Sequence, residues 1–284
     1  MKKFLKHVFI FSAFIALFFI GTFFALKNYP VNQNIYSLPE NINTLFIGDS
    51  HVECAVNDEL LTTAINYAES GDNYFYTFIK LRKLIENNPE VKTVFLSYSY
   101  FNILEYQNKW YYDDKYINFK VSKYLMEMSN EELIKSFTLN PKEFIASIPT
   151  YIKHNALRIV KNKKLPDLEW GGYKSLQNIR RKDMEFTFVD NGNYSALQIH
   201  YLSEIYNYCS ENNIKLNLIA TPIFKWEKQV SLEAKNKYYS LSKQNFINAR
   251  LLDYTDVVMP DTMFADNEHL NKYGAELFTL ETLK

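Results

Sequence analysis

Five short apolar runs alternate along this chain with segments whose apolar residues recur at helical spacing. The apolar runs lie at Asn43 to Ile47, Ala64 to Ala68, Val91 to Ser97, Lys215 to Thr221 and Ala249 to Asp253. Helical spacing occurs at Tyr74 to Glu86, Ala196 to Glu211 and Leu232 to Phe246. Strands that alternate with helices form a mostly parallel sheet with helices on both faces. The sequence therefore predicts a three-layer α/β/α fold around a mostly parallel five-stranded sheet.

The first 27 residues predict a transmembrane helix. Three lysines precede an uncharged, apolar stretch from Val8 to Leu26, close to the roughly 20 residues that cross a bilayer as a helix. A cleaved signal peptide has a shorter apolar core ending at small residues, and a buried core helix would show a polar face, so we favour an uncleaved anchor. The lysines place the N-terminus in the cytoplasm and everything after Lys27 outside it. We expect a single-pass membrane protein with an extracytoplasmic body.

The rest of the chain divides into a short polar connector at 28–40 and one domain at 41–284. Within that domain the alternation lapses from about 103 to 190, where tyrosine, phenylalanine, tryptophan and lysine are frequent. Helical stretches near Glu131 to Phe137 and Lys142 to Leu157 indicate a mostly helical insertion, because the segment is too long for a simple loop. It would serve as a lid, as a binding surface or as extra packing for a small core.

Composition excludes several classes of partner. The 32 basic and 32 acidic residues give no net charge, so we expect no nucleic-acid partner, and the basic run that starts at Lys161 is a solvated loop. The two cysteines, Cys54 and Cys209, form no Cys-x-x-Cys pair that would begin a zinc site, and we interpret them as independent buried side chains. We predict no cofactor and no metal.

Two polar motifs point to one hydrolytic site. Gly48-Asp49-Ser50 directly follows the first predicted strand, and Asp266 and His269 stand three residues apart near the C-terminus. A serine hydroxyl needs an imidazole to take its proton and a carboxylate to orient that imidazole. Each motif alone has a simpler explanation, since Ser and Asp are ordinary turn residues and an aspartate can cap a helix. Both motifs nevertheless fall at the sheet edge where parallel strands end and ligands bind.

In these motifs and their order the chain resembles the SGNH/GDSL hydrolase superfamily from about residue 43 to 280. It is most similar to a membrane-anchored branch linked to acylation of cell-surface polymers. The first block of the family is matched by Gly48-Asp49-Ser50, and the last block, Asp-x-x-His, by Asp266 and His269. The resemblance implies a flavodoxin-like sheet, with Ser50 as the nucleophile, His269 as its base and Asp266 as the carboxylate that orients His269.

The family also implies donors for the oxyanion of the tetrahedral intermediate. The glycine of its second block corresponds to Gly71, and the backbone N–H of Ser50 would be another donor. The third block, Gly-x-Asn-Asp, is missing, because a simple strand alignment puts Ser99 at the asparagine position. Asn102 would supply the side-chain amide only if the loop is bent differently.

The other titratable residues near these motifs receive lesser roles. His51 adjoins the nucleophile and is assigned at most a structural or substrate-contact role. His154 and His200 lie outside the matched blocks and are expected to be packed or exposed. Glu268 stands beside His269 and Asp266, but these residues lack a partner cluster for a metal.

The resemblance implies a serine-dependent esterase or O-acyltransferase that acts through an acyl-enzyme on Ser50. The acyl group would most simply be acetyl, and the substrate an acylated or acyl-accepting carbohydrate of the cell envelope. The anchor and the aromatic insertion favour transfer, with a membrane-bound acyl-donor partner. Two alternatives stay open: a catalytically weak binding or assembly protein that retains the fold, and a lipase-like enzyme for long acyl chains.

Overall fold

The computed structural model describes residues 1–27, 36–161, 171–186 and 193–283. Contacts within the chain divide it into two units. One unit contains Met1–Ile35 and Asp114–Leu168, and the other contains Tyr36–Asp113 and Glu169–Lys284. Most of the expected connector, residues 28–35, and most of the basic run that starts at Lys161 lie outside the described residues. We call the two parts the helical unit and the sheet unit.

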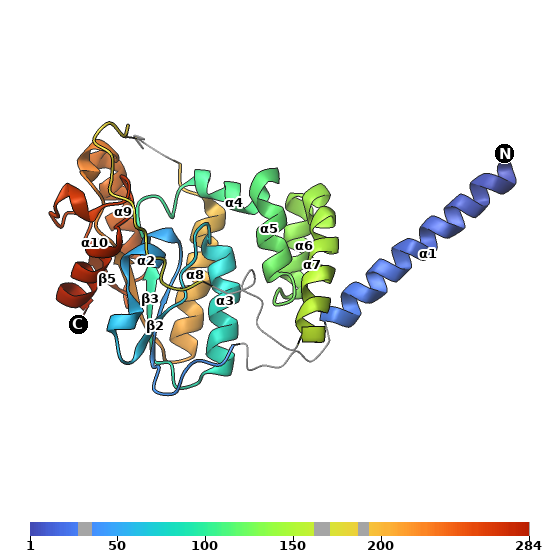
Figure 1. Ribbon diagram of the computed structural model, residues 1–284, viewed down its shortest axis with the longest axis horizontal. Helices are drawn as coiled ribbons and strands as arrows, with labels where there is room; N and C mark the ends of the chain where they lie inside the picture. The colour runs from blue at the N-terminus through green and yellow to red at the C-terminus, as the bar shows by residue number, and fades with distance from the viewer. Residues whose placement is uncertain (28–35, 162–170, 187–192, 284) are drawn as a thin grey trace. The chain divides into compact units, whose positions relative to one another are not determined.

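The sheet unit is built on five parallel strands, as the sequence predicts (Figure 1). They are β1 (Thr44–Ile47), β2 (Ala64–Asn66), β3 (Thr93–Ser97), β4 (Lys215–Ala220) and β5 (Arg250–Asp253). Their order in the sheet is β2-β1-β3-β4-β5, the flavodoxin-like order. In this order β2 lies on one side of β1, whereas β3, β4 and β5 lie on the other side. The direction of the strand order therefore reverses between β1 and β3, and in open α/β sheets ligands bind at the carboxyl ends of the strands at such a switch point.

Helices cover both faces of this sheet (Figure 1). The longer ones are α3 (Tyr74–Asn87), α8 (Ala196–Glu211) and α9 (Leu232–Asn245), which confirm the three helices predicted from apolar spacing. The helix α3 packs against α8, and the short helix α2 (Ser50–Ala55) packs against α10 (Lys272–Phe278). The remaining short elements are η2 (Asp58–Leu60), η3 (Glu105–Asn108), α4 (Lys109–Tyr112), η5 (Trp226–Lys228), η6 (Asp261–Met263) and the π-helical turn η7 (Thr279–Leu283).

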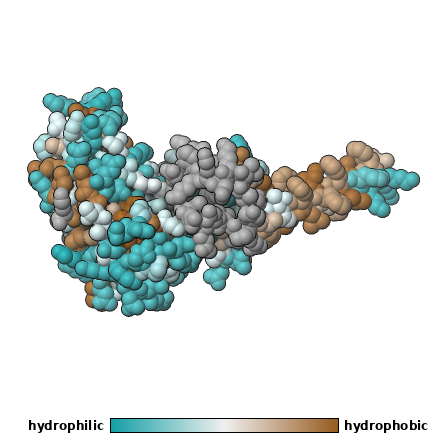
Figure 2. Space-filling model, turned by 60° about the horizontal axis from the view of Figure 1, so that its bottom comes forward, coloured by the Kyte–Doolittle hydropathy of each residue, from teal (hydrophilic) through white to brown (hydrophobic). Residues whose placement is uncertain are grey.

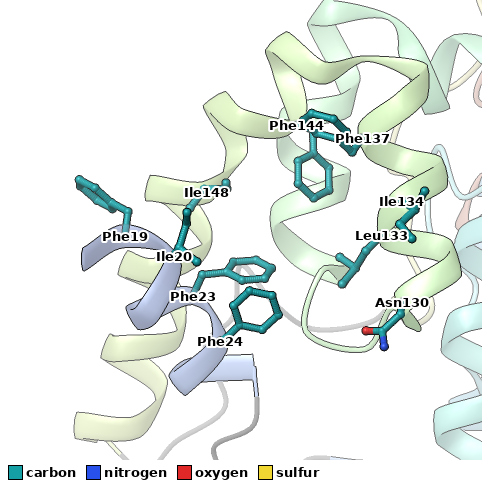
Figure 3. A pocket seen from close by; sticks show the side chains of 10 residues that line it. All are labelled: Phe19, Ile20, Phe23, Phe24, Asn130, Leu133, Ile134, Phe137, Phe144 and Ile148. Carbon is teal, nitrogen blue, oxygen red and sulfur yellow. The ribbon is translucent and has the colours of Figure 1, made fainter. Parts of the chain in front are cut away.

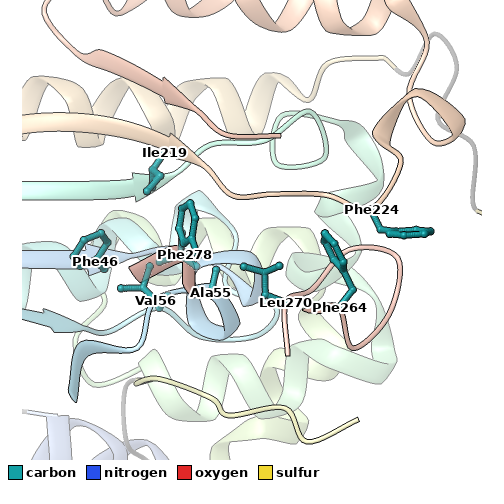
Figure 4. Packing of buried hydrophobic residues seen from close by; sticks show 10 residues of the cluster. Phe46, Ala55, Val56, Ile219, Phe224, Phe264, Leu270 and Phe278 are labelled. Carbon is teal, nitrogen blue, oxygen red and sulfur yellow. The ribbon is translucent and has the colours of Figure 1, made fainter. Parts of the chain in front are cut away.

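One apolar cluster connects the first strand to the last loop of the chain. Phe46 of β1 and Val52 of α2 share it with Phe264, Leu270 and Phe278 from the C-terminal part. Figure 4 shows four of these side chains beside the strands: Phe46, Phe264, Leu270 and Phe278. Burial of an aliphatic or aromatic side chain stabilises a fold by about 1.5–3 kcal/mol. Because residues more than 200 positions apart in sequence share this cluster, hydrophobic packing holds the C-terminal loop against the end of β1.

The helical unit contains α1 (Lys2–Lys27), α5 (Asp114–Tyr124), α6 (Asn130–Leu139) and α7 (Pro141–Lys161). The two helices predicted within the insertion are thereby confirmed as α6 and α7. The rest of the expected insertion that the structure describes, 103–113 and 171–186, belongs to the sheet unit. A capping box at Ser129 and Glu132 starts α6, and Phe23 of α1 is buried among Val121, Phe144 and other residues of α5 and α7.

The helix α1 is long and apolar enough to cross a membrane. Its candidate span is Lys2–Ala25, with a mean hydropathy of 2.5 over its most apolar window. Figure 2 shows hydrophobic surface along this helix and hydrophilic surface at its lysine-bearing tip. At 1.5 Å per residue the span is about 36 Å long, enough for a hydrocarbon core of about 30 Å.

Candidate active site

Ser50 stands at the point where β1 turns into α2, and a glycine makes that turn tight. Gly48 has φ +129, and a Cβ at this position would lie 2.4 Å from Cβ of Ser97 on the neighbouring strand. Only glycine fits such a close approach at positive φ. Asp49 then caps α2 by accepting a hydrogen bond from the backbone N–H of His51 at 3.2 Å. Ser50 is thereby the first residue of a helix at the carboxyl end of a central strand.

The loop before α10 brings His269 to this serine. Nε2 of His269 lies 2.8 Å from Oγ of Ser50, and Nδ1 of His269 lies 2.9 Å from Oδ2 of Asp266. An ionised carboxylate only accepts hydrogen bonds, so Nδ1 carries a proton and Nε2 is free to accept the Ser50 hydrogen. The structure therefore brings together the three residues that the sequence analysis assigned as nucleophile, base and orienting carboxylate.

Backbone hydrogen bonds hold Asp266 in place. Oδ1 of Asp266 accepts from the N–H of Glu268 at 2.7 Å and from the N–H of His269 at 2.8 Å. Burial would raise the pKa of Asp266, but the hydrogen bond and the charge of the His269 side chain, together with these backbone donors, lower it below its usual value. Asp266 is thus an ionised group in a fixed position. An ionised partner stabilises the imidazolium that forms when His269 takes a proton.

A second aspartate–histidine pair lies beside the first and is more deeply buried. Oδ2 of Asp49 lies 3.1 Å from Nδ1 of His51 and accepts a hydrogen bond from Nδ2 of Asn102 at 2.6 Å. Oδ1 of Asp49 accepts from Oγ of Ser97 at 2.7 Å. Burial opposes the charge, but the attraction and hydrogen bond of His51, with those of Ser97 and Asn102, hold the pKa of Asp49 well below its usual range.

The pKa of His51 is shifted in the opposite direction, upward. Burial disfavours its charged form, but the charge and hydrogen bond of Asp49, followed by the charges of Glu268 and Asp266, raise the pKa of His51 to about 9. Its ring centroid lies 5.2 Å from that of His269. Among the residues described, Nε2 of His51 is buried without a hydrogen-bond partner. His51 is therefore part of a buried ion pair with Asp49, which agrees with the structural role expected for it, although its pairing with Asp49 was not predicted.

His51, Glu268 and His269 also form a group whose potential metal-ligating atoms lie within 4.8 Å of one another. In His269, however, Nδ1 faces Asp266 and Nε2 contacts Ser50. A metal ion could bind His269 only by displacing one of these partners. Metal binding and activation of Ser50 would therefore compete for the same nitrogen atoms.

The residues expected to bind an oxyanion differ in their local environment. The backbone N–H groups of Ser50 and Gly71 donate to no acceptor within the part of the chain that the structure describes. Gly71 has φ +76, and a Cβ there would lie 2.7 Å from the Trp110 ring. Nδ2 of Asn102 gives one hydrogen to Asp49, and Oδ1 of Asn102 accepts from N and Oγ of Ser99 at 2.7 and 2.8 Å. A role of Asn102 as oxyanion donor stays a prediction and would use the other hydrogen of its amide.

A buried lysine fixes the loop that carries Gly71, and the sequence analysis did not single it out. The Lys80 side chain is fully buried, and its Nζ lies 2.6 Å from Oδ2 of Asp72 and 2.8 Å from the carbonyl oxygen of Tyr67. On the other side of Gly71, Ser70 donates to Glu53 of α2 through its backbone N–H at 3.0 Å. In the sequence, Lys80 falls among the apolar positions of the predicted helix at Tyr74 to Glu86, and this pattern could have indicated a buried, paired lysine. Paired buried charges of this kind hold a loop firmly, because separating them leaves a charge without compensation.

The remaining histidines and cysteines lie away from this arrangement. His200 is exposed on α8, and His154 is half-buried on α7 of the helical unit. Cys54 and Cys209 are both free and buried, and burial raises the pKa of the Cys209 thiol to about 12. Neither thiol is therefore a nucleophile at neutral pH.

Comparison with known proteins gives little further information. No family model matches the sequence, and no curated protein matches it. A solved structure described as that of "a putative platelet activating factor from Streptococcus pneumonia" matches with a TM-score of 0.43 and 11% sequence identity. The match covers 96% of this chain and 98% of that one. Similarity this low carries no argument about function, so the geometry of the site must carry it.

Proposed function

We propose that this protein is a serine-dependent esterase or O-acyltransferase of the SGNH/GDSL type. The observation that carries the proposal is the hydrogen-bonded series from Ser50 Oγ through His269 to Asp266. This series stands at the switch point of a flavodoxin-like sheet, where ligands bind in such folds. The motif order that resembles the family supports the same assignment.

The first half of the reaction forms an ester on Ser50. Its Oγ attacks the acyl carbonyl carbon while Nε2 of His269 takes the hydroxyl proton, and Asp266 stabilises the resulting imidazolium. The N–H groups of Ser50 and Gly71 receive the oxyanion, for which they have no competing acceptor among the described residues. Collapse of the tetrahedral intermediate breaks the bond to the leaving alcohol, which takes the proton from His269.

The second half releases the acyl group. Water or a sugar hydroxyl gives its proton to Nε2 of His269 and attacks the acyl carbon, and Ser50 leaves as the hydroxyl after regaining that proton. Water yields an esterase, and a sugar hydroxyl yields a transferase. We infer an acetyl group as the acyl unit and a cell-envelope carbohydrate as the acceptor. Both inferences rest on the resemblance rather than on the geometry.

The position of the enzyme in the cell is part of the proposal. The candidate span of α1 and the lysines before it support a cytoplasmic N-terminus and an extracytoplasmic site. A tethered enzyme of this kind can meet a membrane-bound acyl donor, which we propose as its partner. Protease protection of sealed, inverted membrane vesicles tests this topology, because the sheet unit should then be inaccessible from outside.

Covalent labelling tests the chemistry. The full chain in detergent micelles is exposed to a fluorophosphonate probe, which reacts with activated serines. We expect labelling of the wild type and none of Ser50→Ala or His269→Ala. The controls are His200→Ala, which removes an exposed histidine of α8, and Ser175→Ala, which removes an exposed serine, and both should label like the wild type. A folded wild type that does not label would instead support a binding or assembly protein.

A second measurement separates the enzymatic alternatives. Acetyl, butyryl and octanoyl esters of one chromogenic alcohol are compared, with and without acetyl-accepting oligosaccharides. Preference for acetyl supports the proposed substrate class, and preference for octanoyl would support a lipase-like enzyme. Appearance of acetylated oligosaccharide in place of free acetate identifies transfer.

A further inference from the structure

The helical unit contains a hollow of about 610 Å³ that the proposed chemistry does not use. Its volume falls within the roughly 300–1,000 Å³ of typical ligand sites. Figure 3 shows residues of α1, α6 and α7 on the sides of this space. The residues that line it are Phe19, Ile20, Phe23, Phe24, Asn130, Leu133, Ile134, Phe137, Phe144 and Ile148. Nine of these ten side chains are apolar, and Asn130 supplies the polar one. We call this hollow the apolar groove.

The groove is open, and much of its lining would be in contact with water if the helical unit were surrounded by it. Phe23 and Phe144 are buried at its base, whereas Ile134 is 64% and Phe24 is 50% exposed. A contiguous apolar surface of this kind usually marks a binding site for another molecule or for a membrane. The position of the groove along α1 indicates whether its surroundings are water or membrane lipid.

Four of the lining residues, at positions 19, 20, 23 and 24, belong to the candidate membrane span Lys2–Ala25. At 1.5 Å per residue, Phe19 lies about 9 Å along the axis from the end of that span. If α1 crosses the bilayer, the groove therefore lies at the depth of the leaflet opposite the N-terminal lysines. In that case the side chains of α6 and α7 that line it would lie at the same depth, among lipid acyl chains.

We propose that the apolar groove binds an acyl chain of a membrane lipid from that leaflet. A hydrocarbon chain has no hydrogen-bonding groups, so a lining with a single amide side chain satisfies it completely. A peptide segment would bring backbone N–H and C=O groups, for which the groove offers almost no partners. The inference rests on the proposed membrane topology but not on the chemistry at Ser50.

Photocrosslinking in a bilayer tests the inference. The full chain is reconstituted into nanodiscs of phosphatidylcholine that include a phosphatidylcholine with a diazirine at the end of one acyl chain. After irradiation, labelled peptides are mapped by mass spectrometry. We expect labels on α6 and α7, at residues such as Phe137 and Ile148, and competition by excess unlabelled lipid. Labels confined to α1 would overturn the proposal, because they would indicate only lipid that surrounds the helix.

Two isoleucines provide a matched pair of variants. Ile134 lines the groove and is 64% exposed, whereas Ile145 is 57% exposed on α7 and does not line it. A charged side chain among acyl chains is strongly unfavourable, so Ile134→Glu should reduce labelling of α7 by roughly tenfold or more. Ile145→Glu should leave it near the wild-type level. Equal reductions in both variants would overturn the proposal.

Folding of the variant, insertion into the nanodisc and the reactivity of Ser50 are each measured separately. If circular dichroism shows that Ile134→Glu does not fold, Ile134→Trp replaces it, because a larger apolar side chain fills the groove and should also reduce labelling. Failure of the protein to co-elute with nanodiscs would overturn both the topology and the groove. Fluorophosphonate labelling of the same nanodisc sample reports on Ser50 separately, so the proposed enzyme and the proposed lipid site can fail independently.

Discussion

The loops that follow β1 and precede α10 each pair an aspartate with a histidine, but the two pairs differ in exposure. The side chains of Asp49 and His51 are 8% and 5% exposed, whereas those of Asp266 and His269 are 38% and 19% exposed. The distances within the pairs are similar, 3.1 and 2.9 Å. The same two residue types therefore form one pair that is enclosed by protein and one that can meet a substrate.

The two histidines differ in their partners, and only His269 is placed to activate Ser50. With its pKa raised to about 9, His51 already carries a proton on both nitrogens at neutral pH and cannot accept another. His269 contacts Ser50 Oγ directly through Nε2. Adjacency in sequence would favour His51, which follows the nucleophile directly, but burial and the Asp49 carboxylate exclude it as the base. The comparison assigns His51 to structure and His269 to proton transfer.

The largest expected effect is the difference in kcat between a variant of His269 and a variant of His51. His269→Ala should reduce kcat for ester cleavage by about a millionfold, as loss of the base does in other serine hydrolases, which corresponds to about 8 kcal/mol. His51→Gln keeps a donor for Asp49 and should cost at most about tenfold, close to 1.4 kcal/mol. Steady-state kinetics on a chromogenic acetyl ester measures both. A larger loss in His51→Gln than in His269→Ala would reverse the assignment.

The next effect tests Asp266 within the exposed pair. Asp266→Asn should reduce kcat by about ten-thousandfold, because the amide favours the wrong tautomer of His269 and cannot stabilise its charge. KM and the thermal unfolding midpoint should change little, since the side chain is partly exposed. The same kinetic assay and a melting curve check this. A variant with nearly full activity would show that Asp266 only caps the loop.

A smaller effect, on stability rather than on rate, is expected for the enclosed pair. Asp49→Ala removes one partner of a buried ion pair and leaves His51, Ser97 and Asn102 without their acceptor, which should cost about 3–5 kcal/mol of unfolding free energy. Urea unfolding of the full chain in micelles measures the change. Asp266→Ala is the matched control and should cost less, because solvent can replace the lost carboxylate. Equal costs would mean that burial does not distinguish the pairs.

The two pairs also show what the sequence can predict. The five strands and the amphipathic helices follow from local apolar spacing, and the structure places them within a few residues of the predicted ranges. The contact between Ser50 and His269 joins residues 219 positions apart, so only the ordering of motifs along strand ends could suggest it. The partners of Asp49 were not predicted. Its simultaneous hydrogen bonds with His51, Ser97 and Asn102 depend on how closely the ends of β1 and β3 pack.

In the helical unit, too, the sequence predicts the elements but not the contacts between them. Apolar spacing predicted α6 and α7, and hydropathy predicted α1, but neither pattern says which helices pack together. Phe23 of α1 contacts Tyr151 of α7 with ring centroids 5.4 Å apart, and this contact depends on the chain path between them. A membrane segment and an insertion helix were therefore identified separately, and their shared groove became visible only in the structure.

The smallest expected effect is the pH dependence of stability that His51 of the enclosed pair contributes. The pKa of His51 rises from 6.5 to about 9 on folding, so its contribution to stability is fully present below pH 6.5 and is lost as the pH rises through about 9. The contribution is at most about 3 kcal/mol. The lowered pKa of Asp49 acts at low pH, where its contribution to stability is lost only in strong acid.

Urea unfolding of the wild type should therefore show a decline in stability between pH 6.5 and 9, and His51→Gln should show a flatter profile because glutamine does not titrate. Parallel profiles would mean that His51 is neutral in the folded protein, and only its burial and its contact with Asp49 would then exclude it as the base.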